Sequence, residues 1–582
     1  MSASEKAQKD CKTRAKIIIY LVIILSLTLL AKLYMLQIHS FKKYALMSDK
    51  NRIRLSPVLP KRGRIITSDG KIVASSAHKY RLIMDYCSDK VFEKNLNLLG
   101  KCLTLSDQEK QRIIRARKSA RPHMSFVIKD ELSWEEYAGV SMDLFKFSNL
   151  SLETAYARNY AMPLEFSHVI GYVGKSDDAV QILTGKTGVE AFLNDQLIGK
   201  IGNLQTEVNA LAKKVRVTDF VEPENGADIV LTLDSEIQKY VYDVISEERA
   251  GACVVLDILE GEIIAMASAP GFDANLVSNK MTYNQWKDVA ANQLFPLINR
   301  AAVCVYPPGS VFKIVVAFAA LSEGVITPWN RIFCSGGVKQ DDRVFHCWNR
   351  GGHGYLDVCG ALSWSCDCFF FEVARRLGVE KIIKYAKKFG FGSKIGIELP
   401  NESAGLLPTK SWKFSRHGTS WKPYETMIVG IGQGALLSTL LQAAVMMGKI
   451  YTNDYNFAPT MIKGKKKERG LAPIDQKPLE IIKKALRQVC LYGTASRSCN
   501  AEYGISGKTG SSQVRKMKTE EAGVNQKKFD WKFRDHAFFV GCAPYNAPRY
   551  VVAVLVEHGG GGGAVAAPIA RKVFDKLMER QK

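Results

Sequence analysis

The sequence has few cysteines for its length, fewer acidic than basic residues, and only one long apolar run. Thirteen cysteines in 582 residues are too sparse for a small fold built on disulfides, and a chain of this length needs no such bridges. Asp and Glu number 57 against 81 Lys and Arg, which leaves a net charge of +24. This excess permits an anionic partner without choosing one. No basic segment interleaved with aromatic residues is present, so nucleic-acid binding is not expected.

The remaining composition is that of a folded protein. Hydrophobic residues make up 47% of the chain and aromatic residues 10%, which excludes a disordered tail or a solvated linker. At 582 residues the chain is long enough for two or three domains with ordinary cores. The sequence shows no internal repeats. We therefore expect a globular, multidomain protein.

The one long apolar run covers residues 17–38. Its first part, Ile17–Ala31, is uncharged, and after Lys32 the apolar character resumes. A helix of 22 residues rises about 33 Å, which is enough to cross a bilayer. Five basic and two acidic residues precede it, which predicts a cytoplasmic N-terminus, residues 1–16. A cleaved signal peptide is the alternative, but the run is long and no small-x-small cleavage site follows it, so we expect a retained anchor.

The pattern of apolar and polar residues changes near residue 226. Residues 39–225 are mixed and irregular, whereas the region 226–582 has clear periodicity. Predicted strands lie near both ends of this region, at Ala252–Leu256, Ile263–Ala267, Ala537–Gly541 and Tyr550–Val556. Helical segments lie between them, and an amphipathic helix, Ala564–Met578, follows. The pattern predicts an α+β fold in which an antiparallel sheet, closed by strands from both ends, is flanked by helices.

A candidate nucleophile stands at the start of an apolar helix. Pro307–Gly309 breaks the chain, and Ser310 and Lys313 precede the apolar run Ile314–Ala320. Residues three apart share a helix face, so a desolvated Lys313 amine could serve as the base that a serine nucleophile needs. The same spacing occurs at Ser40 and Lys43, at Ser68 and Lys71, and at Ser76 and Lys79. Those three pairs lack the buried helix, so we interpret them as surface residues.

Two further elements accompany this pair. Ser365-Cys366-Asp367 precedes the apolar helix Phe369–Leu377, and Lys508-Thr509-Gly510 lies in an expected edge strand of small residues, Gly504–Val514. Ser-x-x-Lys, Ser-x-Asn and Lys-Thr-Gly, in that order, form the signature of the serine penicillin-recognising enzymes. The second element departs from it, because Asp367 stands where most members have asparagine. A carboxylate only accepts hydrogen bonds, whereas an amide also donates them.

Lys186-Thr187-Gly188 also spells the third motif. Apolar residues follow it at helical spacing, so we expect it to introduce a helix rather than to lie in a strand. It also precedes the nucleophile in the sequence. Neither Lys-Thr pair has the glycine five residues before its Gly-Lys that a phosphate-binding P-loop requires, which excludes that kind of nucleotide site.

The whole chain resembles a class B penicillin-binding protein. Motifs similar to the N-terminal pedestal of that class are Arg62–Ile65, Arg158–Tyr160, His168–Tyr172 and Gly188–Glu190. Motifs similar to its transpeptidase domain are Met266–Pro270, Gly430–Gly434 and His536–Gly541. The Ser-Cys-Asp form, Gly352–Gly354 and Leu407–Thr409 resemble the elongation branch, penicillin-binding protein 2, whereas division-specific relatives usually carry Ser-x-Asn. The resemblance implies a pedestal over 39–225 and a penicillin-binding transpeptidase domain over 226–582.

The resemblance implies a D,D-transpeptidase that cross-links peptidoglycan stem peptides during elongation and shape maintenance. Ser310 would attack the penultimate D-alanine carbonyl, Lys313 would accept its proton, and Ser365 would relay a proton to the leaving nitrogen. Lys508 would keep the site positive. β-Lactams would acylate the same serine.

The resemblance also assigns the substrate-binding residues. Thr509 would bind the terminal carboxylate, with Gly510, Ser511 and Asp367 as further substrate-binding positions. The backbone N–H groups of Ser310 and Ser511 would form the oxyanion hole.

The implied partners follow from the same branch. No glycosyltransferase domain fits beside the two expected domains, so the resemblance implies a RodA-type SEDS glycosyltransferase and an elongation complex as partners. It further implies a single-pass protein of the inner membrane whose catalytic domain is periplasmic.

Five of the 13 cysteines fall between residues 334 and 368. Cys334, Cys347, His353 and Cys366 make a Cys₃His set suited to tetrahedral zinc. A Cys334–Cys347 disulfide or unpaired thiols are the alternatives. Some members of the elongation branch place zinc beside the second motif with Asp, His and Cys ligands, so the resemblance implies a structural zinc.

Other functions remain open on the sequence alone. In a carboxypeptidase or a β-lactamase, water would resolve the acyl-enzyme, but no Glu-x-x-Leu-Asn segment of the class A β-lactamases follows the second motif. A division-specific transpeptidase and a non-catalytic β-lactam sensor are further alternatives. Labelling with penicillin separates these classes. Stable labelling indicates a transpeptidase, rapid turnover of the label indicates a β-lactamase or carboxypeptidase, and no labelling indicates a non-catalytic protein.

Overall fold

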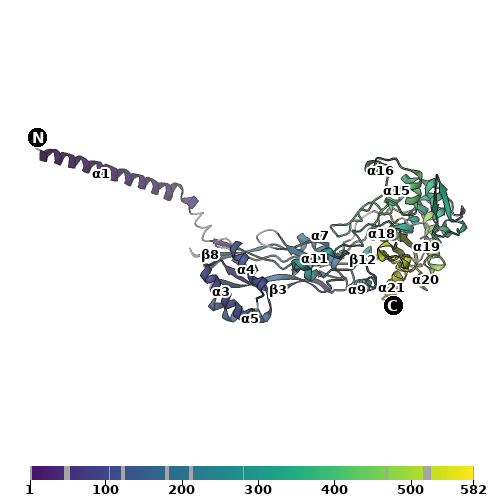
Figure 1. Ribbon diagram of the computed structural model, residues 1–582, viewed down its shortest axis with the longest axis horizontal. Helices are drawn as coiled ribbons and strands as arrows, with labels where there is room; N and C mark the ends of the chain where they lie inside the picture. The colour runs from purple at the N-terminus through teal and green to yellow at the C-terminus, as the bar shows by residue number, and fades with distance from the viewer. Residues whose placement is uncertain are drawn as a thin grey trace. The chain divides into compact units, whose positions relative to one another are not determined.

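The computed structural model describes residues 3–44, 53–103, 105–119, 125–147, 149–176, 182–208, 214–279, 281–465, 470–515 and 526–580. The chain forms two compact units (Figure 1). The first consists of Met1–Pro60, Lys79–Ala155 and Lys200–Asn225, and the second of Lys61–His78, Tyr156–Gly199 and Gly226–Lys582. All predicted site residues belong to the second unit. The domain boundary expected near residue 226 rests on the change in sequence pattern there, and it stays a prediction.

One long helix begins the described chain. Helix α1 (Ala3–Tyr34) continues into a short π-helical turn, η1 (Met35–His39). The segment Cys11–His39, which runs from α1 to the end of η1, is the one described segment long and apolar enough to cross a membrane, with a mean hydropathy of 2.4. The predicted span, 17–38, lies inside this segment. The helix begins earlier because the preceding Ala, Glu, Gln and Lys residues are good helix formers.

The first unit contains a small sheet and a helical layer. Its antiparallel sheet consists of β1 (Ile53–Val58), β8 (Gly202–Val208) and β9 (Lys214–Val221). A separate core contains β4 (Ser125–Leu132), α3 (Asp89–Cys102), α4 (Asp107–Ser119) and α5 (Trp134–Asp143).

In the second unit, three of the pedestal motifs meet in a buried ion-pair cluster. Glu190, on α7 (Gly188–Phe192), accepts hydrogen bonds from Nε of Arg62 and from Nε of Arg158, both at 2.6 Å. All three side chains are buried, and such charges are tolerated only when they are paired. Thr187 is the residue before α7, so this Lys-Thr-Gly introduces a helix, as predicted.

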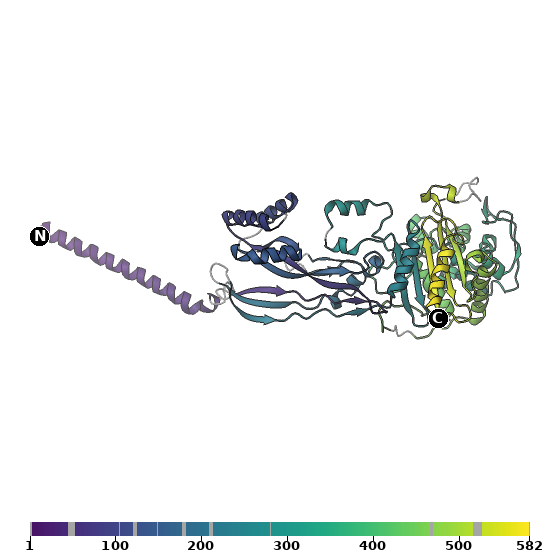
Figure 2. The same cartoon turned by 90° about the horizontal axis from the view of Figure 1, so that it is seen from below.

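A five-stranded antiparallel sheet forms the centre of the second unit. Its strand order is β12 (Glu262–Ala269), β11 (Gly251–Asp257), β19 (Tyr550–Val556), β18 (His536–Ala543) and β17 (Ser506–Ser512). Strand β11 pairs directly with β19, so strands from the two ends of this region lie side by side (Figure 2). The predicted closure of the sheet is confirmed, and β17 lies at its edge.

Helices cover both faces of this sheet. Side chains of β11 alternate between two cores: Val254 faces one, and Val255 faces the other. Helices α9 (Ser235–Ser246) and α21 (Ala566–Glu579) pack on the second core, and α18 (Leu440–Thr452) packs on the first. The α+β class predicted from the sequence is therefore confirmed.

Candidate active site

The nucleophile lies in a tight turn between the Pro-Pro-Gly break and an apolar helix. Ser310 is in the 3₁₀ turn η3 (Gly309–Phe312), and α12 (Lys313–Ser322) follows. The predicted α-helix thus begins at Lys313, because the turn at Ser310 is more tightly wound. Gly309 has φ +54°, and its N–H donates to the carbonyl of Gly432 at 2.9 Å. The loop that carries Ser310 is therefore fixed in place before the helix starts.

The turn also lies directly against the third motif. A Cβ added at Gly309 would come within 2.6 Å of the Ser511 carbonyl oxygen, and one added at Gly510 would come within 3.1 Å of the Pro308 carbonyl oxygen. Glycine is required for this close approach of two backbones. The sequence elements around Ser310 and Lys508 are thus neighbours in space.

Lys313 connects the first motif to the second. Its side chain is fully buried, and its Nζ donates to the Ser365 carbonyl oxygen at 2.8 Å, to Ser365 Oγ at 3.3 Å and to Asp367 Oδ1 at 2.7 Å. These three bonds use all three donors of an ammonium group. Lys313 is therefore held as the buried partner of the Asp367 carboxylate.

Ser310 makes no comparable contact. Its hydroxyl forms no hydrogen bond with any residue that the structure describes, and the side chain is half-buried. The three hydrogen bonds of Lys313 Nζ all go to the second motif instead. Catalytic hydrogen bonds are often long before substrate binds, so the transfer of a proton from Ser310 to Lys313 stays a prediction.

The second motif occupies a sharp turn between two helices. Ser365 lies between α13 (Val358–Ser363) and α14 (Asp367–Leu377) and has φ +55°, an uncommon value for a residue other than glycine. Cys366 is the N-cap of α14, and its Sγ accepts from the Phe369 N–H. This turn aims both the Ser365 hydroxyl and its carbonyl at Lys313.

Asp367 accepts with both carboxylate oxygens. Oδ1 accepts from Lys313, and Oδ2 accepts from the Trp348 N–H at 2.8 Å. An asparagine would present its NH₂ group to one of these two donors. The departure from Ser-x-Asn thus fits its surroundings, where two donors face one side chain.

Lys508 is the second buried amine of the site. It is fully buried on β17, and its Nζ donates to the Thr509 carbonyl oxygen at 3.1 Å. Desolvation and, next, the positive charge of Lys313 hold the pKa of Lys508 well below its ordinary value, although Asp367 opposes this. Thr509 Oγ1 lies 2.6 Å from Thr494 Oγ1. The resting site thus contains one ion-paired amine and one amine that burial drives toward neutrality.

Sequence reasoning did not select three of these neighbours as site residues. Gln433 Nε2 donates to the Ser511 carbonyl oxygen at 3.1 Å, Gly432 contacts the nucleophile turn, and Thr494 contacts Thr509. Gly432 and Gly434 have φ of +76° and +78°, so the glycine-rich segment Gly430–Gly434 was the available signal. No signal in the sequence marked Thr494, because its contact with Thr509 depends only on how the chain packs.

The predicted Cys₃His set converges. Ligand atoms of Cys334, Cys347, His353 and Cys366 all lie within 4.8 Å of one another. His353 Nδ1 is 3.5 Å from Cys334 Sγ and 3.6 Å from Cys347 Sγ. Zn–S and Zn–N bonds of about 2.3 and 2.0 Å in a tetrahedron place the ligand atoms about 3.5 Å apart. All 13 cysteines are free thiols, and the donor set fits a tetrahedral metal.

Cys368 is a fifth sulfur at this cluster. Cys347 is the first cause that raises the pKa of the Cys368 thiol, followed by burial and then Cys334, although the sequence-based set left Cys368 out. It is buried, and it lies in the first turn of α14, where Cys366 already supplies a sulfur.

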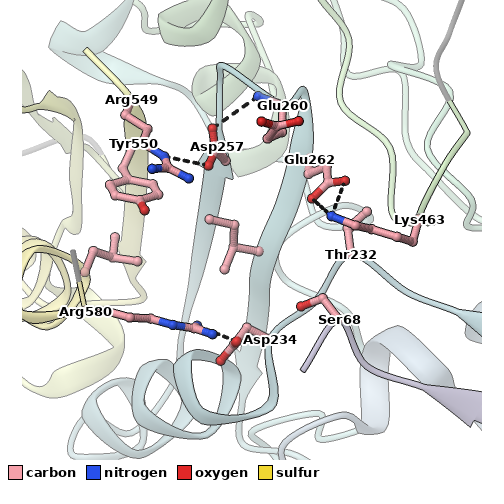
Figure 3. Close-up of a pocket in the computed structure, with 12 residues that line it drawn as sticks. Ser68, Thr232, Asp234, Asp257, Glu260, Glu262, Lys463, Arg549, Tyr550 and Arg580 are labelled. Atoms are coloured by element: carbon pink, nitrogen blue, oxygen red, sulfur yellow. Dashed lines mark hydrogen bonds and ion pairs between the residues drawn. The ribbon is translucent and has the colours of Figure 1, made fainter. Parts of the chain in front are cut away.

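The second unit also contains a cavity of about 830 Å³ (Figure 3). Three carboxylates in its lining are paired with cations from distant segments: Asp257 with Arg549 at 2.9 Å, Glu262 with Lys463 at 2.9 Å, and Asp234 with Arg580. None of the predicted catalytic or metal-binding residues lines it. Its charges hold chain segments together, so we do not assign the chemistry to this cavity.

Comparison with known proteins identifies the family. Residues 251–575 match the family model of the penicillin-binding protein transpeptidase domain, and residues 57–231 match that of the penicillin-binding protein dimerisation domain. The chain belongs to the class B penicillin-binding proteins. It is 32% identical to the peptidoglycan D,D-transpeptidase MrdA of Salmonella typhimurium over 585 residues, which cover 95% of this chain and 94% of that protein. Relatives of this kind place the chain in the elongation branch of these serine-type enzymes.

Solved structures agree with this family. The complex between penicillin-binding protein 2 and MreC from Helicobacter pylori contains a chain with a TM-score of 0.80 and 26% identity, covering 90% of this chain and 99% of that one. A peptidoglycan synthase complex that coordinates polymerisation and cross-linking contains a chain with a TM-score of 0.69 and 28% identity, covering 97% of both chains. The fold predicted from the resemblance is therefore confirmed.

Proposed function

We propose that this chain is a membrane-anchored peptidoglycan D,D-transpeptidase of cell-wall elongation, with Ser310 as its nucleophile. The observation that carries the proposal is the convergence of three motifs. Lys313 binds Ser365 and Asp367, and the turn that holds Ser310 packs against β17, the strand of Lys508. Segments almost 200 residues apart in the sequence thus build one site around a half-buried serine.

The first half of the reaction forms an acyl-enzyme. Ser310 Oγ attacks the carbonyl of the penultimate D-alanine, and its proton passes to Lys313. For this step Lys313 must be a neutral amine, which it becomes when its ammonium proton passes to Asp367 Oδ1, 2.7 Å away. The backbone N–H groups of Ser310 and Ser511 stabilise the oxyanion, a device that contributes about 3–4 kcal/mol per donor. The C–N bond then breaks, and Ser365 passes a proton to the nitrogen of the leaving D-alanine.

The second half transfers the acyl group. An amine of a second stem peptide attacks the ester carbonyl and expels Ser310 Oγ, which takes a proton back from Lys313. The proton that the attacking amine loses then passes to Lys313. Thr509, together with Gly510 and Ser511 of the edge strand β17, binds the carboxylate end and backbone of the donor peptide. If water replaces the amine, the same site acts as a carboxypeptidase. β-Lactams acylate Ser310 because they resemble the donor.

Labelling with a fluorescent penicillin tests this assignment. We expect the wild-type chain to be labelled stably and Ser310→Ala to lose all labelling, since the ester cannot form without the hydroxyl. The control is Ser40→Ala, which removes a serine with the same Ser-x-x-Lys spacing and should label normally. Thermal unfolding checks that both variants fold. Labelling of Ser310→Ala at the wild-type level would refute the site.

We also propose that Cys334, Cys347, His353 and Cys366 hold a structural zinc. The four donors come from the end of β13 (Ile332–Cys334), the loop after β15 (Arg343–His346), the residue before β16 (Gly354–Leu356) and the N-cap of α14. Zinc would link these segments to the turn that carries Ser365. With four protein ligands it would have no open position for chemistry.

Metal analysis tests the zinc proposal. Protein purified without added zinc should contain about one zinc per chain, and Cys347→Ser should lose most of it and unfold at lower temperature, because structural zinc contributes folding energy. Cys368→Ser, which removes the neighbouring fifth sulfur, should keep the metal. Absence of zinc together with two thiols missing from a thiol count would show a disulfide instead.

The partners and location proposed from the sequence have separate support. One described helix is long and apolar enough to serve as an anchor. Of the similar solved structures, one is a complex of penicillin-binding protein 2 with MreC, and another is a peptidoglycan synthase complex that coordinates polymerisation and cross-linking. We propose an inner-membrane location with a cytoplasmic N-terminus, and a RodA-type SEDS glycosyltransferase as the partner that supplies glycan strands. Co-purification with that enzyme, and its loss when 17–38 is replaced by an unrelated span, tests this.

A further inference from the structure

Two exposed tryptophans lie beside the second motif, and the chemistry above uses neither of them. Trp364 directly precedes Ser365 and is 41% exposed. Trp348 follows Cys347 and is 58% exposed. Large apolar side chains that remain exposed next to a catalytic residue mark a binding surface more often than side chains scattered singly over a protein.

Trp348 is held rigidly, with its polar atom turned inward. Its backbone N–H donates to Asp367 Oδ2 at 2.8 Å, and its indole Nε1–H donates to the Trp364 carbonyl oxygen at 3.0 Å. Its ring packs at 61° to His353, with 5.4 Å between the centroids. An exposed indole usually sends its N–H to water, but here that bond is internal, so the part of the side chain that meets solvent is hydrocarbon and π surface.

The residues that carry this surface lie next to the reacting groups, since Trp364 directly precedes Ser365. Asp367 accepts from the Trp348 backbone N–H on one carboxylate oxygen and from Lys313 Nζ on the other, so a single carboxylate separates the Trp348 backbone from the buried amine. The donor peptide has its own binding element, because β17 is an edge strand with small residues. Trp348 and Trp364 lie in a different part of the site, and neither of them has an assigned ligand. A transpeptidase must also bind a second substrate, the amine acceptor.

The chemistry of that acceptor suits an indole. A primary amine is an ammonium ion at neutral pH, and the Asp367 carboxylate is already paired with Lys313. A further carboxylate would attract the ammonium but would also compete with Asp367 for Lys313. The face of a tryptophan attracts a cation without carrying a charge, and it also packs against methylene groups.

We propose that Trp348, with Trp364 beside it, is the acceptor subsite, and that it binds the alkyl-ammonium side chain of a diamino acid in the second stem peptide. This rests on the transpeptidase function proposed above. The ammonium gives up one proton, which Ser365 receives after it has protonated the leaving D-alanine, and the free amine then attacks the acyl carbonyl. The subsite thereby favours a long primary amine over water as the group that resolves the acyl-enzyme.

The ratio of transfer to an amine over hydrolysis by water, as the two fates of the acyl-enzyme, tests this proposal. The full chain in detergent is given a D-alanyl-D-alanine pentapeptide as donor, and a tripeptide with a free diamino-acid side chain or glycine as acceptor. Trp348→Leu and Trp348→Ala should lower the ratio of tripeptide transfer to hydrolysis about three- to fivefold, the size expected of one exposed cation–π contact. Transfer to glycine, which has no alkyl-ammonium side chain, should not change. Trp348→Phe should retain most of the tripeptide transfer.

The control is Trp329→Ala, which removes a tryptophan that is 86% exposed in the same unit and should leave the ratio unchanged. The rate of penicillin labelling separates the subsite from a structural role. An unchanged transfer ratio in Trp348→Leu overturns the proposal. Labelling slowed equally in Trp348→Leu and Trp348→Phe also overturns it, because Trp348 would then only support Asp367. A wild-type chain that penicillin does not label contradicts the transpeptidase function itself, and the subsite with it.

Discussion

At the scale of single residues, the site is defined by how buried charges are matched. Lys313 has a carboxylate partner, whereas Lys508 has only a backbone carbonyl. Asp367 can serve both Lys313 and the Trp348 N–H because a carboxylate accepts on two oxygens. The aspartate that departs from the usual motif is thus the residue that joins the buried amine to the cysteine cluster, through Cys366 next to it and Trp348 after Cys347.

The buried amine of Lys508 should cost stability. Its pKa is lowered in the folded chain, so the unfolded chain binds the proton more readily, and the stability of the protein falls as the pH drops below the unfolded value near 10.5. Lys508→Met should therefore have a free energy of unfolding about 1 kcal/mol higher than that of the wild type at pH 7. This difference in stability should be larger at pH 6 than at pH 10. Penicillin labelling should be strongly reduced.

Thermal unfolding at these three pH values measures the effect. The control is Lys477→Met, which removes an exposed lysine of α19 (Gln476–Leu491) and should shift stability little at any pH. A stability gain of Lys508→Met that does not grow as the pH falls would contradict the depressed pKa.

At the scale of elements, the site depends on the close approach of η3 and β17. Two backbones meet where Gly309 faces Ser511 and Gly510 faces Pro308, and the Gly432 carbonyl accepts from Gly309 behind them. The oxyanion donors proposed above come from these two elements, so their spacing sets the geometry of the reaction.

Gly309→Ala should disrupt this spacing. Its Cβ would lie 2.6 Å from the Ser511 carbonyl oxygen, and its φ of +54° disfavours any side chain. We expect a loss of about 2–3 kcal/mol in stability and at least a hundredfold slower acylation, measured by unfolding and by stopped-flow penicillin labelling. Gly324→Ala is the matched control, because Gly324 has φ +66° but open space around it. Equal effects of the two variants would show that backbone strain alone is responsible.

At the scale of the whole molecule, the second unit draws on segments from three parts of the chain. Arg62, Arg158 and Glu190 come from two of them, and they form a buried cluster rather than a surface of exposed pairs. Breaking a buried pair leaves an uncompensated charge, which costs far more than the loss of an exposed pair.

Glu190→Gln should therefore lower stability by about 3–5 kcal/mol, because two buried arginines lose their shared carboxylate. The midpoint of the first unfolding transition in urea measures this, since a chain of several units does not unfold in one step. Glu224→Gln, which breaks the exposed Lys200–Glu224 pair, should change the midpoint little. A similar small change for Glu190→Gln would mean that water reaches the two arginines.

The sequence alone determined the features that local pattern encodes. The apolar run predicted a helix long enough to cross a membrane, and alternation predicted the strands β11, β12, β18 and β19. The three motifs gave the candidate catalytic residues, because residue type and order carry that chemistry. The Cys₃His set was also visible, and its convergence is confirmed, although spacing alone left a disulfide open.

Only the tertiary structure decided which groups meet. The Lys313–Asp367 ion pair, the Trp348 indole bond to Trp364 and the contact of Gly432 with Gly309 join residues that are 16 to 123 positions apart in the sequence. No local propensity sets such pairings, because they depend on how α12 packs against α14 and how η3 packs against β17. The same packing takes up the Lys313 amine and leaves Ser310 without a hydrogen-bond partner among the described residues, which the motif spacing could not foresee.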